Sequence, residues 1–229
     1  MSKTNSKKKS KKSSNKSLNL YTDDNPQTTI HGTGFANKGA ANKTLELIKH
    51  RSLGYQFALV NTLYNRARYH PYPTKDMNEA MKVFMNFLYK YKKEKREQDK
   101  LYPFVPLDII KSYEKLAQKY RVSEVARGVK PSIKTDMGFL KMLKHVSHPN
   151  KLQFIPIKKL KPQGEDYWSY RLNFIKSRLA QMKSTNTPLF YSDGKYSGFP
   201  TKQHVILIMH GYSPLGDKLK TFYNDTAYL

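Results

Sequence analysis

The sequence predicts a mainly α-helical protein, in which two small helical modules follow a disordered, basic N-terminal arm. Three observations favour this fold class. Apolar residues recur at helical spacing in several segments, and capping residues, glycines and prolines separate those segments. The 229-residue chain is 38% hydrophobic and 13% aromatic, which is a richer supply of core side chains than disordered proteins contain. A chain of this length can bury a sizeable core.

Composition and turn signals divide the chain into four expected parts. They are a Lys/Ser-rich arm, a first helical module with a Gly-rich start, a second, mainly helical module that allows one short strand pair, and a C-terminal tail: 1–28, 29–98, 99–219 and 220–229. The first 20 residues contain seven lysines and no acidic residue, a composition that predicts disorder. Such an arm neutralises phosphates or acts as a nuclear localisation signal, and a solubilising terminus is the alternative. The candidate phosphate contacts within it are Lys7, Lys8, Lys9, Lys11 and Lys12.

Two helices are expected at the start of the first module. The first covers residues 40–50 and the second covers 55–69. The apolar residues of the second follow helical spacing: Leu59, Val60, Leu63 and Ala67. Pro71 and Pro73 end this helix, because proline lacks a backbone N–H and disfavours helical geometry in the residue before it.

A third helix is expected after these prolines. Thr74 is suited to be its N-cap, and Asp76 falls in the first turn, where a carboxylate is favoured by the helix dipole. Five apolar residues recur at helical spacing and should face the core: Met77, Met81, Phe84, Leu88 and Tyr91. The charged segment 90–100 that follows is expected either as a solvated helix or as a linker.

The second module is expected to contain helices over 107–121 and 165–183 and a nearly fully buried helix after Thr201. The first of these carries a ridge of like charge, which costs stability unless an anion meets it. Its members are Lys111, Lys115 and Lys119. Segment 152–161 allows a short strand, and its proline favours an edge or a loop.

The charge balance restricts the class of partner. Lys and Arg number 42 and Asp and Glu number 17, which gives a net charge of +25, and a polyanion relieves the self-repulsion of such a chain. The longest purely aliphatic stretch, Val205–Met209, is far too short to cross a bilayer. We therefore expect a nucleic acid as partner, DNA more than RNA, and no membrane. The chain has no cysteine, which excludes disulfides and thiol nucleophiles and disfavours a structural zinc site.

Eight residues of the folded modules are candidate nucleic-acid contacts because they are basic or aromatic and fall at helix ends or on outward faces. They are Arg66, Arg68, Tyr69, His70, Arg171, Arg178, Lys202 and His204. The first four crowd the outer end of the second helix, where arginines suit phosphates and rings suit stacking; a solvated helix end is the alternative. Arg171 and Arg178 are seven residues apart and share a helix face. His204 falls in the first turn of the last helix, where it could face a ligand.

No catalytic residue, metal site or cofactor is expected. The acidic residues are scattered and mostly precede or start helices, whereas a metal-dependent nuclease needs closely placed carboxylates. His145 and His148 share a helical face, but Pro149 ends that helix and a third ligand would have to come from elsewhere. No Walker, zinc or Gly-x-Ser-x-Gly pattern occurs. We therefore expect a protein that is not an enzyme, with a nuclease or recombinase as the remaining enzymatic option.

Segments of both modules resemble domains found in uncharacterised basic proteins of large DNA viruses and some phages. One such domain has a Gly-rich start and a Tyr-Asn-Arg-Ala-Arg/Lys-x-His-x-x-x-Thr-x-x-Met core, and it is similar to GTGFANKGAANKTLELI followed by YQFALVNTLYNRARYHPYPTKDMNEAMKVF. The matching residues are Tyr64, Asn65, Arg66, Ala67, Arg68, His70, Thr74 and Met77. A second such domain is similar to ARGVKPSIKTDMGFL, YWSYRLNFIKSRLAQM and GFPTKQHVILIMHGYSP, with matches at Arg171, Thr201 and His204. The resemblance covers most of residues 30–217 and implies a viral protein, with packaging in the virion as one option.

Three functional hypotheses remain. The first is a viral nucleic-acid-binding protein without sequence specificity, which packages or condenses a genome. The second is a minor capsid or virion structural protein whose basic arm contacts the genome or acidic shell proteins, and the third is a nuclease or recombinase. A continuous basic face on the folded modules would favour the first, and apolar patches with charge confined to the arm would favour the second. The expected location is the virion, the host nucleus or a cytoplasmic virus factory; secretion is not expected, because no apolar segment follows the basic N-terminus.

Overall fold

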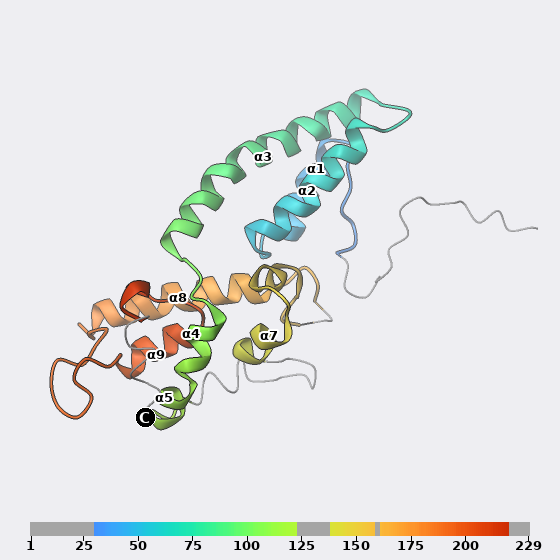
Figure 1. Cartoon of the computed structure of the whole chain (residues 1–229). Coiled ribbons are helices and arrows are strands. Elements are labelled where there is room, and N and C mark those ends of the chain that lie inside the picture. Colours follow the sequence, from blue (N-terminus) through green and yellow to red (C-terminus); the bar gives the residue numbers. More distant parts are fainter. Residues whose placement is uncertain (1–29, 123–137, 159–160, 220–229) are drawn as a thin grey trace, which may run out of the picture.

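A computed structural model of the chain describes residues 30–122, 138–158 and 161–219. This part of the chain is mainly helical (Figure 1), which confirms the predicted fold class. The expected arm at 1–28 and tail at 220–229 lie outside the described residues. The first unit, residues 30–101, contains three helices: α1 (Lys38–Ile48), α2 (Leu53–Arg68) and α3 (Lys75–Leu101).

The first unit forms because each of its helices has one apolar face. α1 and α2 both pack against α3, and Figure 1 shows them beside the half of α3 that is nearer the α2–α3 turn. The side chain of Asn37 accepts the backbone N–H of Ala40 to start α1. Thr74 accepts the N–H of Met77 to start α3, as the sequence predicts. The buried core of this unit consists of Ile30, Ala41, Ile48, Val60, Leu63, Ala80 and Phe84.

α3 is one continuous helix of 27 residues. Segment 90–100, for which the sequence left helix and linker open, is helical throughout, so α3 runs three residues past the expected module boundary at 98. Apolar contacts hold one side of it. Phe84 is buried, and Tyr91 stacks on Phe57 of α2 with ring centroids 4.4 Å apart.

The second unit, residues 105–219, is made of shorter elements. They are α4 (Leu107–Ser112), α5 (Glu114–Lys119), α7 (Phe139–His145), the 3₁₀ helix η1 (Pro149–Phe154), α8 (Tyr167–Ser184) and α9 (Lys202–Met209). The single helix expected over 107–121 is wrong, because Tyr113 interrupts it. The Tyr113 side chain is fully buried, and its hydroxyl donates to the carbonyl oxygen of Leu219 at 3.2 Å. The three lysines of the expected ridge are therefore divided between two short helices.

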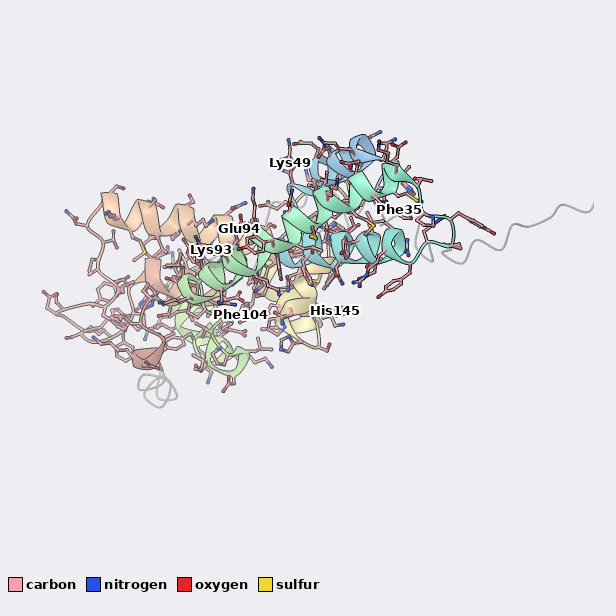
Figure 2. The ribbon with its side chains drawn as sticks, turned by 90° about the horizontal axis from the view of Figure 1, so that it is seen from above. Phe35, Lys49, Lys93, Glu94, Phe104 and His145 are labelled. Carbon is pink, nitrogen blue, oxygen red and sulfur yellow. The ribbon has the colours of Figure 1, made fainter. Side chains whose placement is uncertain are left out.

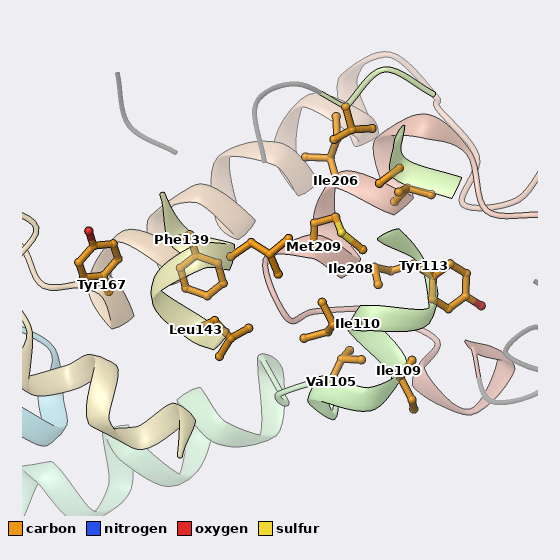
Figure 3. Packing of buried hydrophobic residues seen from close by; sticks show 14 of the residues in the cluster. Val105, Ile109, Ile110, Tyr113, Phe139, Leu143, Tyr167, Ile206, Ile208 and Met209 are labelled. Carbon is orange, nitrogen blue, oxygen red and sulfur yellow. The ribbon is translucent and has the colours of Figure 1, made fainter. Parts of the chain in front are cut away.

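Apolar side chains from α4, α7, α8 and α9 meet in the core of the second unit (Figure 3). All residues from Val205 to Met209 are buried, as expected for the last helix. Thr201 caps α9 by accepting the N–H of His204. Gly211 follows α9 with a φ of 73°, the left-handed conformation in which glycine commonly ends a helix. A Cβ at this position would lie 2.8 Å from Cζ of Phe104.

The strand pair that the sequence allowed is not formed in the described residues. Two isolated antiparallel bridges are present instead, Pro156–Asp166 and Phe190–Pro200. The start of the expected strand at 152–161 belongs to the 3₁₀ helix η1. A proline in each bridge limits pairing, because proline has no N–H to donate to a ladder.

A buried arginine in the turn between α1 and α2 joins the first unit to the second. Arg51 Nε lies 3.1 Å from Oδ2 of Asp166, and the two side chains are 1% and 0% exposed. The other guanidinium nitrogens donate to the carbonyl oxygens of Pro162 at 2.6 Å and Gln153 at 3.2 Å. The guanidinium carbon lies 3.7 Å from the ring centroid of Tyr55. Every bond of this guanidinium to a carboxylate or carbonyl reaches into the second unit.

Asp166 satisfies groups of both units with one carboxylate. Its Oδ1 accepts the N–H of Ser169 at 2.8 Å and caps α8. Its Oδ2 accepts the backbone N–H of Ser52 at 2.8 Å in addition to Arg51 Nε. Asp166 therefore starts α8 and also fixes the start of α2. The orientation of α2, and with it the hairpin that α2 forms with α3, therefore depends on Asp166.

Candidate nucleic-acid interface

The outward face of α3 carries a row of mostly basic and polar side chains, which we call the α3 stripe: Lys75, Asn78, Lys82, Asn86, Tyr89, Lys93, Arg96 and Lys100. At about 100° per residue these positions fall within about 40° of one line along the helix, and all eight are exposed. The buried Ala80 and Phe84 lie on the opposite side. The stripe is about 38 Å long at about 1.5 Å of rise per residue. Figure 2 locates Lys93 within it.

Packing within the described part of the chain leaves the stripe uncovered. α1 and α2 contact the side of α3 that carries Phe84. Near its C-terminal end, Gln98 of α3 lines a cleft of about 560 Å³ between the two units, together with Lys49, Glu165 and Lys176. Gln98 is about 160° from the stripe, so the second unit also meets α3 on the side away from it.

Few carboxylates neutralise the stripe. Glu79 and Glu97 flank it, each about 60° from its line. Lys82 Nζ lies 2.7 Å from Oε1 of Glu79, and the hydrogen bond and charge of Lys82 lower the pKa of Glu79 below its ordinary value. Between Glu79 and Glu94 the chain has four lysines and no acidic residue. All charged side chains in this central part of the helix are therefore positive.

The predicted contacts at the end of α2 lie at an exposed tip, just before the stripe begins. Tyr69 is 73% exposed and Tyr72 is 79% exposed. The guanidinium carbon of Arg68 is 5.4 Å from the ring centroid of Tyr69. His70 Nδ1 contacts the backbone of Tyr72, and its ring meets the ring of Phe35 edge on. His70 therefore holds the turn in place, while Arg68 and Tyr69 are presented to solvent.

Three other predicted contacts differ in exposure. Lys202 is exposed at the start of α9, whereas Arg66 and Arg178 are half-buried. Arg178 Nη1 donates to the side-chain oxygens of Gln181 and Gln203 at 3.1 and 2.9 Å, so this guanidinium is engaged within the second unit. The structure brings none of the three into the α3 stripe.

The expectation that Arg171 contacts nucleic acid is wrong, because this side chain is fully buried. Its Nε donates to the carbonyl oxygen of His210 at 2.9 Å, and its Nη2 donates to those of Pro103 and Gly211 at 3.1 and 2.8 Å. Burial lowers the pKa of Arg171 to about 9, so it remains a cation at neutral pH. Arg171 therefore closes the C-terminal end of α9 and cannot reach a phosphate.

His204 is also buried, which corrects its predicted position facing a ligand. Its Nδ1 lies 2.9 Å from the carbonyl oxygen of Leu189, which can only accept, so Nδ1 donates. Its Nε2 then accepts the hydroxyl proton of Ser213 at 2.9 Å. Both ring nitrogens are satisfied inside the second unit. The remaining predicted contacts, Lys7, Lys8, Lys9, Lys11 and Lys12, lie outside the described residues.

Two buried histidines make stability depend on pH. Burial lowers the pKa of His204 and of His210 to about 4, compared with about 6.5 in an unfolded chain. Between these values the unfolded state binds more protons, so stability falls as the pH falls. We expect the free energy of unfolding to drop by about 2 kcal/mol per histidine between pH 7 and pH 5. Urea unfolding followed by the emission of Trp168 measures this drop.

A matched pair of variants assigns the pH effect. His210 is sandwiched between Phe174 and Phe139, with ring centroids 3.7 and 5.3 Å away. We expect His210→Gln to be less stable at pH 7 but to lose less stability on acidification. His50→Gln removes an exposed histidine and should leave the pH dependence as it is in the original chain. A stability that stays constant from pH 7 to pH 5 in the original chain would contradict the assignment.

Comparisons with known protein families and with curated proteins give no information on function for this chain. No model of a known protein family and no curated protein matches the chain. Among the described residues, no three His, Asp or Glu side chains are grouped so that they could hold a metal ion. The described helices also include none with the length and hydropathy needed to cross a bilayer.

The α3 stripe has a periodic signal in the sequence. Lys75, Lys82, Tyr89 and Arg96 recur every seven residues, as do Lys93 and Lys100. Residues seven apart share a helix face only if the helix is continuous. The sequence did not decide whether segment 90–100 is a helix or a linker. The periodicity therefore predicts a shared helix face only once the structure shows that α3 is continuous.

Proposed function

We propose that this protein binds nucleic acid without sequence specificity, through phosphates held along the α3 stripe. The observation that carries the proposal is the alignment of exposed cations on one side of a continuous helix, opposite its buried face. Binding to phosphates releases condensed counterions, and this release provides a driving force that does not depend on base sequence. Arg68 at the tip and the lysines of the arm add further phosphate contacts.

The position of the charge favours this function over a virion structural protein that uses only its arm. Among the described residues, none of Lys93, Arg96 and Lys100 takes part in an ion pair. Like charges at this spacing on a helix repel one another, and a bound polyanion removes that penalty. A viral setting, with packaging or condensation of a genome as the role, is part of the proposal and rests on the resemblance of both modules to viral domains.

Removing charge from the stripe should weaken binding more than removing the same charge elsewhere. For the triple variant Lys93→Gln, Arg96→Gln, Lys100→Gln we expect an affinity for a DNA duplex at least tenfold lower at about 0.1 M salt. The slope of log affinity against log salt should fall by about 2 to 3, because each lost phosphate contact removes about 0.9. Fluorescence anisotropy titrations at several salt concentrations measure both quantities.

The control is a second triple variant with the same loss of charge. Lys111, Lys115 and Lys119 are exposed on α4 and α5 in the second unit, and their replacement by Gln should change the slope by less than 1. Equal effects of the two triple variants would show that net charge alone governs binding and would exclude the stripe as the site. The same titration with a chain that starts at Thr28 measures how much of the DNA affinity comes from the arm.

A further inference from the structure

Among the exposed large hydrophobic side chains of the first unit, Tyr89 has the highest exposed fraction. It is 84% exposed, and Met85, one turn earlier on α3, is 53% exposed. No hydrogen bond or ring contact joins Tyr89 to another described residue, so it has no role in the packing of this part of the chain. Single exposed rings are common on folded surfaces, but Tyr89 lies in a row of exposed cations, and its ring offers a free face for stacking.

Cations surround this ring along the stripe. Lys82 and Arg96 are seven residues before and after Tyr89, about 10 Å away in each direction along the helix axis. Lys93 is one turn further on, and like Tyr89 it is exposed. The nearest acidic residues along the chain are Glu79 and Glu94, ten before and five after, and Glu94 is about 140° around the helix from Tyr89. The ring is therefore the apolar centre of a positively charged track.

This combination specifies what kind of nucleic acid fits. Phosphate contacts alone require no aromatic side chain. A tyrosine ring on a helix surface binds a base by stacking on the flat face of that base. In a duplex, both faces of each base are covered by neighbouring base pairs. We propose, on the basis of the proposed function, that the α3 stripe binds nucleic acid with unpaired bases, and that one base stacks on Tyr89 while Lys93 and Arg96 hold the adjacent phosphates.

The tip extends this arrangement. Tyr72 and Tyr69 are both more than 70% exposed, and Tyr72 precedes Lys75, the first residue of the stripe, by three positions. The guanidinium of Arg68 beside Tyr69 combines a phosphate contact with a stacking surface, as Lys93 and Tyr89, one turn apart, do on α3. Aromatic rings at both places allow a strand to follow the helix with stacking at more than one base.

The test compares oligonucleotides that differ only in their bases. The probes are a fluorescent 12-nucleotide thymidine strand, a strand of the same length with abasic sugars, and a 12-base-pair duplex. For the full chain we expect the thymidine strand to bind at least tenfold more tightly than the abasic strand. Tyr89→Ala should weaken binding of the thymidine strand by roughly 5- to 100-fold and change binding of the abasic strand less than twofold. Tyr89→Phe, which keeps the ring, should retain the affinity for thymidine.

The outcomes separate this inference from the proposed function. Equal affinity of the original chain for the thymidine and abasic strands, or tighter binding of the duplex, overturns the inference and leaves the proposed function standing. Unchanged thymidine binding by Tyr89→Ala also overturns it and would assign the exposed ring to another partner, such as a protein. The triple variant Lys93→Gln, Arg96→Gln, Lys100→Gln should weaken both single strands by the same factor. If none of the three probes binds, the proposed function fails as well.

Discussion

Replacing Asp166 with alanine should lower the free energy of unfolding by about 4 kcal/mol or more. The substitution leaves Arg51 buried without a counterion, a change that typically costs about 3–5 kcal/mol. It also removes the N-cap of α8, which contributes about 0.5–2 kcal/mol, and the acceptor of the Ser52 N–H. Since whole domains are stable by only about 5–15 kcal/mol, this single change removes much of the total.

Denaturant unfolding measures the effect of Asp166→Ala. Trp168 is the only tryptophan of the chain and is buried in the second unit, so its emission reports on that core, and circular dichroism reports on all helices. We expect the two signals to separate in the variant, because the first unit loses the bonds that hold it against the second. Asp193→Ala, at an exposed aspartate, should change stability by less than 0.5 kcal/mol, the usual limit for surface substitutions.

A double variant tests whether the ion pair is the cause. Arg51→Met together with Asp166→Leu replaces both charges by apolar side chains, and such replacements are often nearly neutral. We expect this double variant to be more stable than Asp166→Ala alone, although the carbonyls of Pro162 and Gln153 lose their donors. If Asp166→Ala lost less than about 1 kcal/mol, the junction would not depend on this carboxylate.

Arg171→Met should destabilise the protein by about 3–5 kcal/mol without changing its salt-dependent binding. The variant keeps an unbranched side chain but removes the guanidinium donor from the carbonyl oxygens of Pro103 and His210. The carbonyl oxygen of Gly211 also loses this donor but keeps the backbone N–H of Val105 at 2.8 Å. Hydrogen bonds from charged donors contribute about 1.5–3 kcal/mol each. The substitution also removes two cation–π contacts, because the guanidinium carbon of Arg171 lies 4.5 Å from the ring centroid of Phe104 and 5.2 Å from that of Trp168.

Two further variants separate a structural from a binding role at this position. Arg171→Lys keeps the charge but not the planar guanidinium that spans three carbonyls, so we expect an intermediate loss of stability. Arg178→Met, seven residues further along α8 and half-buried, should cost about 1 kcal/mol or less, in the ordinary range for such positions. Thermal unfolding and the salt slope of the folded Arg171→Lys protein measure both properties. A slope reduced by about 1 would instead identify Arg171 as a phosphate contact.

Local features of the fold were predictable from the sequence because they arise from interactions within about four residues. Thr74 is an N-cap as expected, and the last helix begins directly after Thr201 as expected, since a cap needs only the backbone N–H two or three residues later. Leu63, Ala67 and Phe84 are buried as expected, because apolar residues at helical spacing form one face. The same reasoning placed Arg68 and Tyr69 at the exposed end of α2.

The positions of the charged side chains were only partly predictable. The sequence pattern predicted Arg171 and His204 as surface residues of basic helices. Both are buried, because carbonyl groups up to 68 residues away in the sequence accept hydrogen bonds from them. The sequence pattern did not predict the role of Arg51, because its carboxylate partner is 115 residues away. A sequence pattern does not contain such pairings, because the free energy of burying a charge depends on partners that only folding brings together.

The sequence by itself determined a mainly helical, strongly basic protein, with some of its caps, turns and apolar core residues, because composition and short-range periodicity are properties of the chain alone. Only the tertiary structure decided which cations face solvent. α1, α2 and the second unit cover one side of α3 and leave the α3 stripe exposed on the other. Arg171 is removed from the surface by the carbonyls around α9. The separation of binding cations from structural ones therefore follows from which helix faces are buried, and long-range packing sets those faces.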